Sequence, residues 1–267
     1  MSILNYISIT LLSLLTTIIF VSGILYSDRK QREPVYMIML CLGSCIFTIC
    51  LSLLLGQIIL PKLEVISTGL FSYNTHNVVK ILILALVEEY SKLLVLYLFI
   101  SRNSNFDDIY DGFVYASLIA LSFAALESII YVFNEPDIAS MRSLAMLRGI
   151  TTVPLHLVCG IAMGYYMGVE KFSWGTKTRL FNLLKCLLVP TLIHFVYNYS
   201  LSNVITKFSS NDIVLVIAMI IFFIPFYLIS FMYIKKTKFL NEKFISNEKY
   251  KKLMTKEEFT EIVSHQY

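Results

Sequence analysis

Three ionisable residues lie close together in the middle of a long apolar stretch. Glu88, Glu89 and Lys92 occur within residues 78–100, where most other side chains are hydrophobic. On an α-helix, which turns by about 100° per residue, the three side chains fall within one arc of roughly 100° and face the same interior. An ionised side chain at the middle of a bilayer costs about 2.5–3.5 kcal/mol on insertion scales. We therefore predict that these groups are paired or hydrated and that they mark a functional site.

Further polar side chains lie deep within each of the next three apolar stretches. They are Glu127, His156 and His194, together with Arg148 in the outer part of one stretch and Asn198 one helical turn after His194. Burying each group separately would incur several desolvation costs, whereas one shared water-filled cavity offsets most of them. We predict a single site that these residues share with the two glutamates. Arg148 either pairs with Glu127, orients a substrate carbonyl, or extends to the membrane surface.

Prolines and glycines flank the two histidines. Pro154 and Pro190 each remove one helical hydrogen bond and free a carbonyl, which is tolerated in a membrane where the carbonyl faces protein or a cavity. Gly160, Gly164 and Gly168 recur at intervals of four residues and predict a close approach by a neighbouring helix.

Carboxylates, imidazoles and an amide suit the activation of water. Lys92 can hold one of the adjacent glutamates ionised, which leaves the other to take a proton from water and pass it to a leaving amine. His194 and Asn198 share a helix face and can donate hydrogen bonds to an oxyanion. Neither a serine nor a cysteine is clearly placed beside a base, which favours attack by water over a covalent intermediate.

The same residues leave a metal mechanism open. His156, His194 and a glutamate such as Glu127 could bind zinc and keep one position for water. The sequence has no HExxH motif, and the ligands would come from separate helices. It therefore requires no cofactor, but zinc remains an alternative.

The elements that position these residues are transmembrane helices. The 267-residue chain is 57% hydrophobic and 15% charged, against roughly 25% charged residues in soluble domains. We predict an all-α polytopic bundle of about seven spans, each with the roughly 20 residues that cross a bilayer. The predicted spans are 3–26, 35–60, 78–100, 110–133, 143–169, 180–204 and 213–234. Asp111 and Gly112 open the fourth span as a helix cap or as part of a cytoplasmic gate.

The chain divides into residues 1–234, a membrane bundle with its catalytic core at about 78–204, and a basic tail at 235–267. Eight lysines follow the last span, and alternate loops carry the other basic clusters. By the positive-inside rule, the N-terminus lies outside and the tail in the cytoplasm. The net charge of +4 then reflects topology and attraction to anionic lipid rather than binding of nucleic acid. The tail should contain a short helix at about 255–263.

The order of the motifs resembles the PrsW-type intramembrane proteases, within the wider group of CAAX prenyl endopeptidases and Abi-type proteins. The matching motifs are Glu88-Glu89-x-x-Lys92, Asp111-Gly112-Phe113, Phe123-x-x-x-Glu127, Pro154-x-His156 with Gly160 and Gly164, and His194-x-x-x-Asn198. The resemblance covers about residues 78–198. Motifs in this order on each of four consecutive spans form a fairly specific signature.

This resemblance implies a multi-pass protease of the bacterial plasma membrane. Enzymes of this type make the first, outer-side cut in a single-span anti-sigma factor, which leads to release of an extracytoplasmic-function sigma factor. The resemblance also implies that the two glutamates and the histidines are catalytic, and that His194 with Asn198 holds the oxyanion. In the CAAX branch a histidine occupies the position of Glu127, so a prenylated substrate is not expected. His156 then supplies the missing imidazole.

Two other functions stay open from the sequence. Chains of Glu and His also relay protons in ion-coupled carriers, although carriers usually contain inverted repeats, and the sequence shows none. An Abi-like protein could bind a partner peptide without cutting it. The predicted orientation places Glu127 and His194 between the middle of the membrane and its outer face, which suits cleavage near the external surface.

Overall fold

The computed structural model describes residues 3–29, 31–70, 73–173, 175–202 and 212–248 of the chain. Within these residues it is a helical bundle without strands, as the composition predicts. The helices are α1 (Ile3–Ser27), α2 (Val35–Gly43), α3 (Cys45–Leu70), α4 (Tyr73–Val95) with a π-helical turn η1 (Leu96–Ile100), α5 (Ile109–Phe133), α6 (Ile138–Ile150), α7 (Thr152–Phe172), α8 (Thr176–Ser200) and α10 (Asp212–Glu248).

Five helical segments in the described residues are long and apolar enough to cross a membrane. They are Ile3–Ser27, Val35–Glu64, Ile109–Phe133, Ile138–Phe172 and Thr176–Ser200. The protein is therefore a multi-pass membrane protein. The count of seven spans and the orientation of the termini stay predictions.

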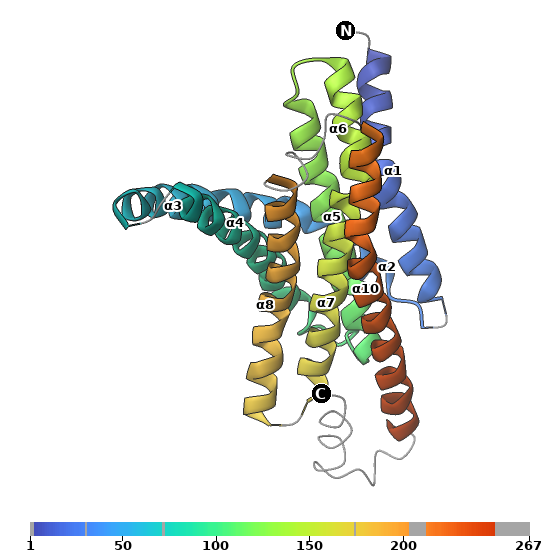
Figure 1. The fold of residues 1–267 in the computed structure, drawn as a ribbon. Helices are drawn as coiled ribbons and strands as arrows, with labels where there is room; N and C mark the ends of the chain where they lie inside the picture. Colours follow the sequence, from blue (N-terminus) through green and yellow to red (C-terminus); the bar gives the residue numbers. More distant parts are fainter. Residues whose placement is uncertain (1–2, 30, 71–72, 174, 203–211, 249–267) are drawn as a thin grey trace.

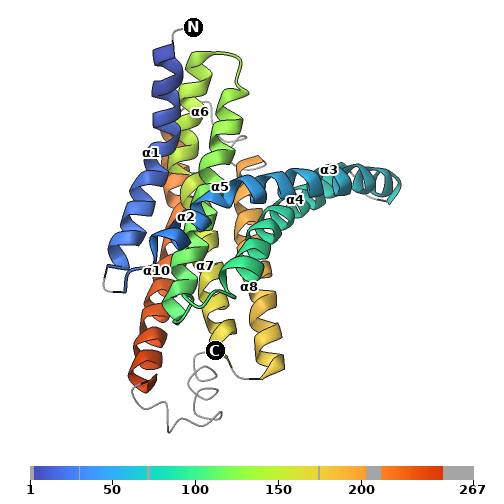
Figure 2. The same cartoon turned by 180° about the vertical axis from the view of Figure 1, so that it is seen from behind.

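The helices follow two directions. Figures 1 and 2 show α1, α5, α6, α7, α8 and α10 running along one common direction, while α3 and α4 form a hairpin that projects from its side. The hairpin meets the bundle where α4 packs against α8 and α3 packs against α5. Because α4 carries Glu88 and Glu89, this crossing brings both glutamates to the middle of the bundle.

The centre of the bundle is the tight contact between α5 and α7. A Cβ atom added to Gly160 would lie 2.7 Å from the Cβ of Ala120, and one added to Gly164 would lie 2.8 Å from the Cα of Phe113. Real Cβ atoms do not approach other atoms so closely, so only glycine fits at these positions. The close helix approach predicted from the glycine spacing is confirmed, and the neighbour is α5.

Two spans predicted as single helices are each divided at a hydroxyl residue. Ser44 separates α2 from α3 and donates a hydrogen bond to the carbonyl of Cys41. Thr151 separates α6 from α7 and donates to the carbonyl of Leu147. Such side-chain bonds compete with the helical hydrogen bonds. At the second break, Pro154 also lacks the N–H that would continue the helix.

The first turn of α5 is capped by carboxylates. Asp108 accepts a hydrogen bond from the backbone N–H of Asp111 at 3.0 Å, and Asp111 accepts one from the N–H of Asp108 at 2.9 Å. Of the two roles predicted for Asp111, the helix cap is therefore present. Asn241 of α10 donates to Asp108 at 3.0 Å and accepts from the N–H of Ile109 at 2.9 Å.

The first part of the predicted tail continues the last helix. α10 passes residue 234 without a break and ends at Glu248. The division of the chain at residue 234 stays a prediction, and the short helix predicted at 255–263 lies outside the described residues.

Candidate active site

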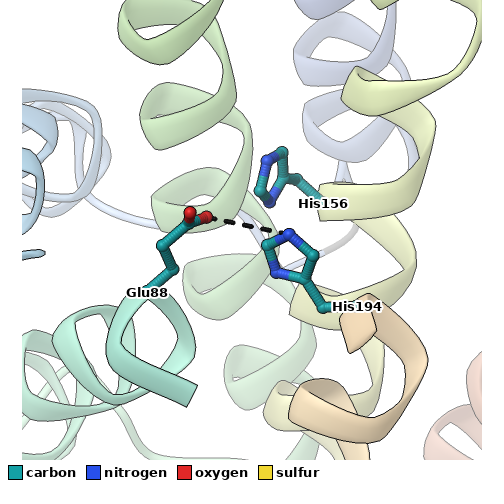
Figure 3. A group of neighbouring side chains, drawn as sticks. All are labelled: Glu88, His156 and His194. Carbon is teal, nitrogen blue, oxygen red and sulfur yellow. Dashed lines mark ion pairs between the residues drawn. The ribbon is translucent and has the colours of Figure 1, made fainter. Parts of the chain in front are cut away.

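Side chains from four helices meet where the hairpin enters the bundle. Glu88 and Glu89 come from α4, Glu127 from α5, His156 from α7 and His194 from α8. Figure 3 shows Glu88, His156 and His194 directed toward one another, with an ion pair between Glu88 and His194. The two imidazole rings meet edge to face, with centroids 5.0 Å apart.

Glu89 pairs with Lys92 and His194 on the buried side of this cluster. Its Oε1 lies 2.7 Å from Nζ of Lys92 and 2.9 Å from Nδ1 of His194, and both Glu89 and Lys92 are buried. Lys92 also lies 2.9 Å from Nδ1 of His156 and 4.2 Å from the centre of the Phe123 ring. The ammonium charge is thus balanced by a carboxylate and packed against an aromatic face, which makes its burial tolerable.

Glu127 forms a second ion pair on the opposite side of His156. Its Oε2 lies 2.6 Å from Nη2 of Arg148 and 3.1 Å from Nε2 of His156. Arg148 also donates to the hydroxyl of Ser128 at 3.1 Å and stacks 4.6 Å from the centre of the Tyr131 ring. Of the three roles predicted for Arg148, the structure shows pairing with Glu127.

Glu88 is the least engaged of the three glutamates. Its Oε2 lies 3.8 Å from Nε2 of His194. Among the described residues, this oxygen and Oε2 of Glu89 are buried without a hydrogen-bond partner. Glu88 and Glu127 both line a cavity of about 370 Å³ that opens beside the cluster. A buried carboxylate oxygen left without a donor costs about 1–3 kcal/mol or more, so it indicates a group that meets water, an ion or a substrate.

The donor atoms have the composition of a metal site. One ligand atom each from Glu88, His156 and His194 lie within 4.8 Å of one another. Two imidazoles and a carboxylate are a known ligand set of catalytic zinc. Glu127 is outside this group of three in the described residues. Its Oε2 is held by Arg148.

The two histidines carry their protons on different ring nitrogens, and this affects how each could bind a metal. Because an ionised Glu89 only accepts hydrogen bonds, Nδ1 of His194 carries the proton and Nε2 presents a lone pair toward Glu88. Lys92 only donates, so Nδ1 of His156 accepts and Nε2 holds a proton facing Glu127. His194 therefore fits a ligand role directly, whereas binding through Nε2 of His156 requires the proton to be lost from Nε2 and one to be gained at Nδ1, which ends the hydrogen bond from Lys92 to that atom.

Asn198 does not join this hydrogen-bonded cluster. It is half-buried one turn beyond His194, and the bonds found among the described residues do not link its amide to the site. The sequence did not single out Tyr197, whose hydroxyl bonds to Thr152 at 3.0 Å and Thr151 at 3.1 Å. These bonds fasten α8 to the start of α7 beside both histidines. Its position three residues after His194, on a nearby face of the same helix, was the available signal.

Fold and site together define a class. A multi-pass helical bundle that buries three carboxylates, two imidazoles and two paired cations, with an open cavity at two of the carboxylates, is typical of an intramembrane hydrolase. The comparisons with known proteins give this class a family. A model of the PrsW family of intramembrane metalloproteases matches residues 31–228, and the chain belongs to this family.

Several relatives support the same assignment. "Protease PrsW" of Oceanobacillus iheyensis is 33% identical over 202 residues, covering 75% of this chain and 84% of the relative. "Protease PrsW" of Clostridioides difficile is 29% identical over 192 residues, covering 72% and 78%. That of Bacillus subtilis is 29% identical over 178 residues, covering 66% and 74%. No solved structure matches the chain. The protein is thus an intramembrane peptide hydrolase, and the carrier that the sequence left open is set aside.

Proposed function

We propose that this protease cuts a membrane-anchored protein by attack of water at the cluster of Glu88, His156 and His194. The observation that carries the proposal is Oε2 of Glu88: among the described residues it is buried without a hydrogen-bond partner, it lies 3.8 Å from Nε2 of His194, and its side chain lines an open cavity. A closed structural ion pair would have its oxygens occupied. Here a carboxylate oxygen without a hydrogen-bond donor, the cavity and the histidines occur at one place.

The same three residues would hold a zinc ion, since their donor atoms are close enough and one oxygen lacks a partner. Zinc, when bound, acts as a Lewis acid that polarises the scissile carbonyl and makes water a better nucleophile at neutral pH. The distances favour Glu88 over the predicted Glu127 as the carboxylate ligand. Binding through Nε2 of His156 would also release Glu127 from its bond to that atom.

The remaining residues move protons and balance charge. Glu127 lines the cavity, and we assign to it the transfer of a proton from water to the leaving amine. Arg148 positions Glu127 and can bind the substrate carbonyl. Glu89 fixes the tautomer of His194, and Lys92 offsets the negative charge of Glu89. Because Nδ1 of His194 donates its hydrogen bond to Glu89, this imidazole is better suited to bind a metal than to donate to an oxyanion, which is the role predicted from the sequence.

The substrate we propose is a single-span anti-sigma factor cut near its external end. Support comes from the motif resemblance and from the predicted orientation, which places the cluster in the outer half of the bilayer. A bacterial strain that carries an inactive variant should accumulate the uncut anti-sigma factor and fail to induce its sigma-factor genes. Membrane proteomics that shows no accumulating single-span protein would contradict this substrate.

Two conservative substitutions test the assigned roles. Glu88→Gln should lose both bound zinc and cleavage, because it removes a charged ligand. Glu127→Gln should keep zinc and lose about 100-fold or more in rate, as expected for loss of a proton-transfer group. The measurements are metal content by mass spectrometry and cleavage of a mixture of synthetic transmembrane peptides by the purified proteins.

Glu242→Gln is the matched control, because Glu242 is exposed on α10 far from the cluster. Zinc content in Glu88→Gln equal to that of the unmodified protein would refute the ligand role. Cleavage by Glu127→Gln at the unmodified rate would refute the proton transfer.

A further inference from the structure

The cavity beside the site extends between three helices. It has a volume of about 370 Å³ and is lined from α3, α4 and α5. Glu88 and Glu127 form its polar end, so the cavity is continuous with the proposed site, and most of its other lining residues are apolar. This volume is near the lower end of the roughly 300–1,000 Å³ of ligand pockets, enough for a few side chains and not for a whole helix.

One face of α3 forms the outer wall. Its lining residues run from Ile49 to Pro61 at intervals of three or four positions along one side of the helix. Gly56 lies in the middle of this wall, and a Cβ atom added there would meet nothing within 4 Å. Unlike the glycines between α5 and α7, Gly56 is not required by packing. Its missing side chain instead leaves space in the cavity.

The wall also offers groups that a peptide backbone can bind. The amide side chain of Gln57 and the hydroxyl-bearing Ser52 line the cavity. Pro61 lies inside α3 and lacks an N–H, so it cannot donate to the carbonyl of Gln57 four residues earlier. A peptide that leaves its helical form within a membrane needs donors and acceptors for its exposed backbone groups. This wall supplies both kinds.

We infer that this cavity binds the unwound segment of the substrate on one side of the scissile bond, and that Gly56 sets the size of the apolar side chain accepted there. The inference rests on the proposed protease site and deepens it. Its occupant is an extended apolar peptide, because the cavity combines the carboxylates of Glu88 and Glu127 with an apolar wall that also carries backbone-binding groups.

The test fills or enlarges the cavity and reads out selectivity. The probe is a mixture of synthetic lysine-flanked transmembrane peptides with five randomised central positions, and mass spectrometry identifies the bonds cut. Gly56→Leu should lower cleavage at sites with Leu, Met or Phe by about tenfold or more relative to sites with Gly or Ala, since a lost methylene-sized space has effects of this order. Leu53→Ala, which enlarges the same wall, should shift the preference toward larger side chains.

Gly23→Leu is the control, because Gly23 is exposed on α1 and a Cβ there also meets nothing within 4 Å. If Gly56→Leu and Leu53→Ala both cut the same sites as the unmodified protein, the cavity does not bind substrate, and a lipid chain becomes its occupant. Failure of the protease proposal looks different, because the unmodified protein would then show no cleavage that depends on Glu88.

Discussion

Two groups of buried carboxylates occupy this molecule, and they are satisfied in different ways. At the start of α5, Asp28, Glu33, Asp108 and Asp111 gather, and none of them forms an ion pair with a cation within the described part of the chain. Asp28 accepts from the backbone N–H of Glu33 at 3.2 Å, Glu33 accepts from the hydroxyl of Tyr115, and the two aspartates cap the helix. None of their oxygens is among the buried atoms that lack a partner in the described residues. The hydrogen bonds of this acidic cap come from backbone, hydroxyl and amide donors.

The active-site cluster is the opposite case. It contains cations and imidazoles that balance its charge, yet Oε2 of Glu88 and of Glu89 have no hydrogen-bond partner among the described residues. Electrostatic balance and hydrogen-bond completion are therefore separate properties. A structural cluster needs every polar atom satisfied within the fold, whereas a reactive cluster keeps atoms open for what it binds. The comparison predicts that substitutions in the cap change stability and those in the site change chemistry.

Glu89→Gln should give the largest effect, because Glu89 serves both purposes. It is the carboxylate of the buried pair with Lys92 and the acceptor for His194. Removing one partner of a buried ion pair costs about 3–5 kcal/mol, since the other charge is left uncompensated. We expect a clearly lower thermal midpoint in detergent, together with loss of cleavage.

A second substitution separates these two losses. Glu89→Gln combined with Lys92→Met removes the ammonium that the single change leaves without its carboxylate, so the thermal midpoint should recover in part while cleavage stays absent. An unchanged midpoint in the single variant would show that Glu89 and Lys92 do not form the pair seen in the structure.

Asp108→Ala should have a smaller effect and a purely structural one. Loss of an N-cap side chain costs about 0.5–2 kcal/mol, and Asn241 also loses its acceptor. The thermal midpoint should fall, while the cleavage rate per folded molecule stays unchanged. Asp107→Ala is the control, because Asp107 is exposed and its hydrogen bond to the cap comes from its backbone N–H, which the substitution keeps. A lower cleavage rate per folded Asp108→Ala molecule would remove the distinction between cap and site.

The sequence predicted the members of the cluster better than their individual roles. Intramembrane charges must find partners, so Glu88, Glu89, Lys92 and the histidines could be assigned to one place from helix periodicity alone. Glu88 and Glu89 lie four and three residues before Lys92 on the same helix, so both are within reach of it, and side-chain rotamers and the neighbouring helices decide which one pairs. Periodicity gives the shared face but not those rotamers, so the missing hydrogen bond at Oε2 of Glu88 and the position of Asn198 outside the network required the structure.

The sequence pattern also could not predict the direction in which each helix runs. A hydrophobic stretch reports the length of a helix and not its tilt, so residues 35–60 and 78–100 were both expected to run along the bundle. Packing instead sets the direction of the α3–α4 hairpin, which the figures show crossing the other helices. The breaks at Ser44 and Thr151 coincide with local hydroxyl bonds that an apolar average over some 20 residues does not detect.

Asp28 offers the smallest predicted effect and a pH-dependent one. Burial raises the pKa of its carboxyl to about 7, with Glu33 and Asp108 nearby adding to the rise and the N–H of Glu33 opposing it. The folded state therefore holds this proton more tightly than the unfolded chain, whose carboxyl has its ordinary pKa of 3.8. Stability should fall as pH rises from about 4 to about 7 and stay level above that range.

Asp28→Asn keeps an acceptor for Glu33 but cannot ionise, so its thermal midpoint should match the unmodified protein at pH 4.5 and exceed it slightly at pH 8. If the variant and the unmodified protein have equal midpoints at both pH values, ionisation of Asp28 does not lower the stability of the folded state. Hydrogen-bond donors alone would then be enough to bury this cluster of carboxylates.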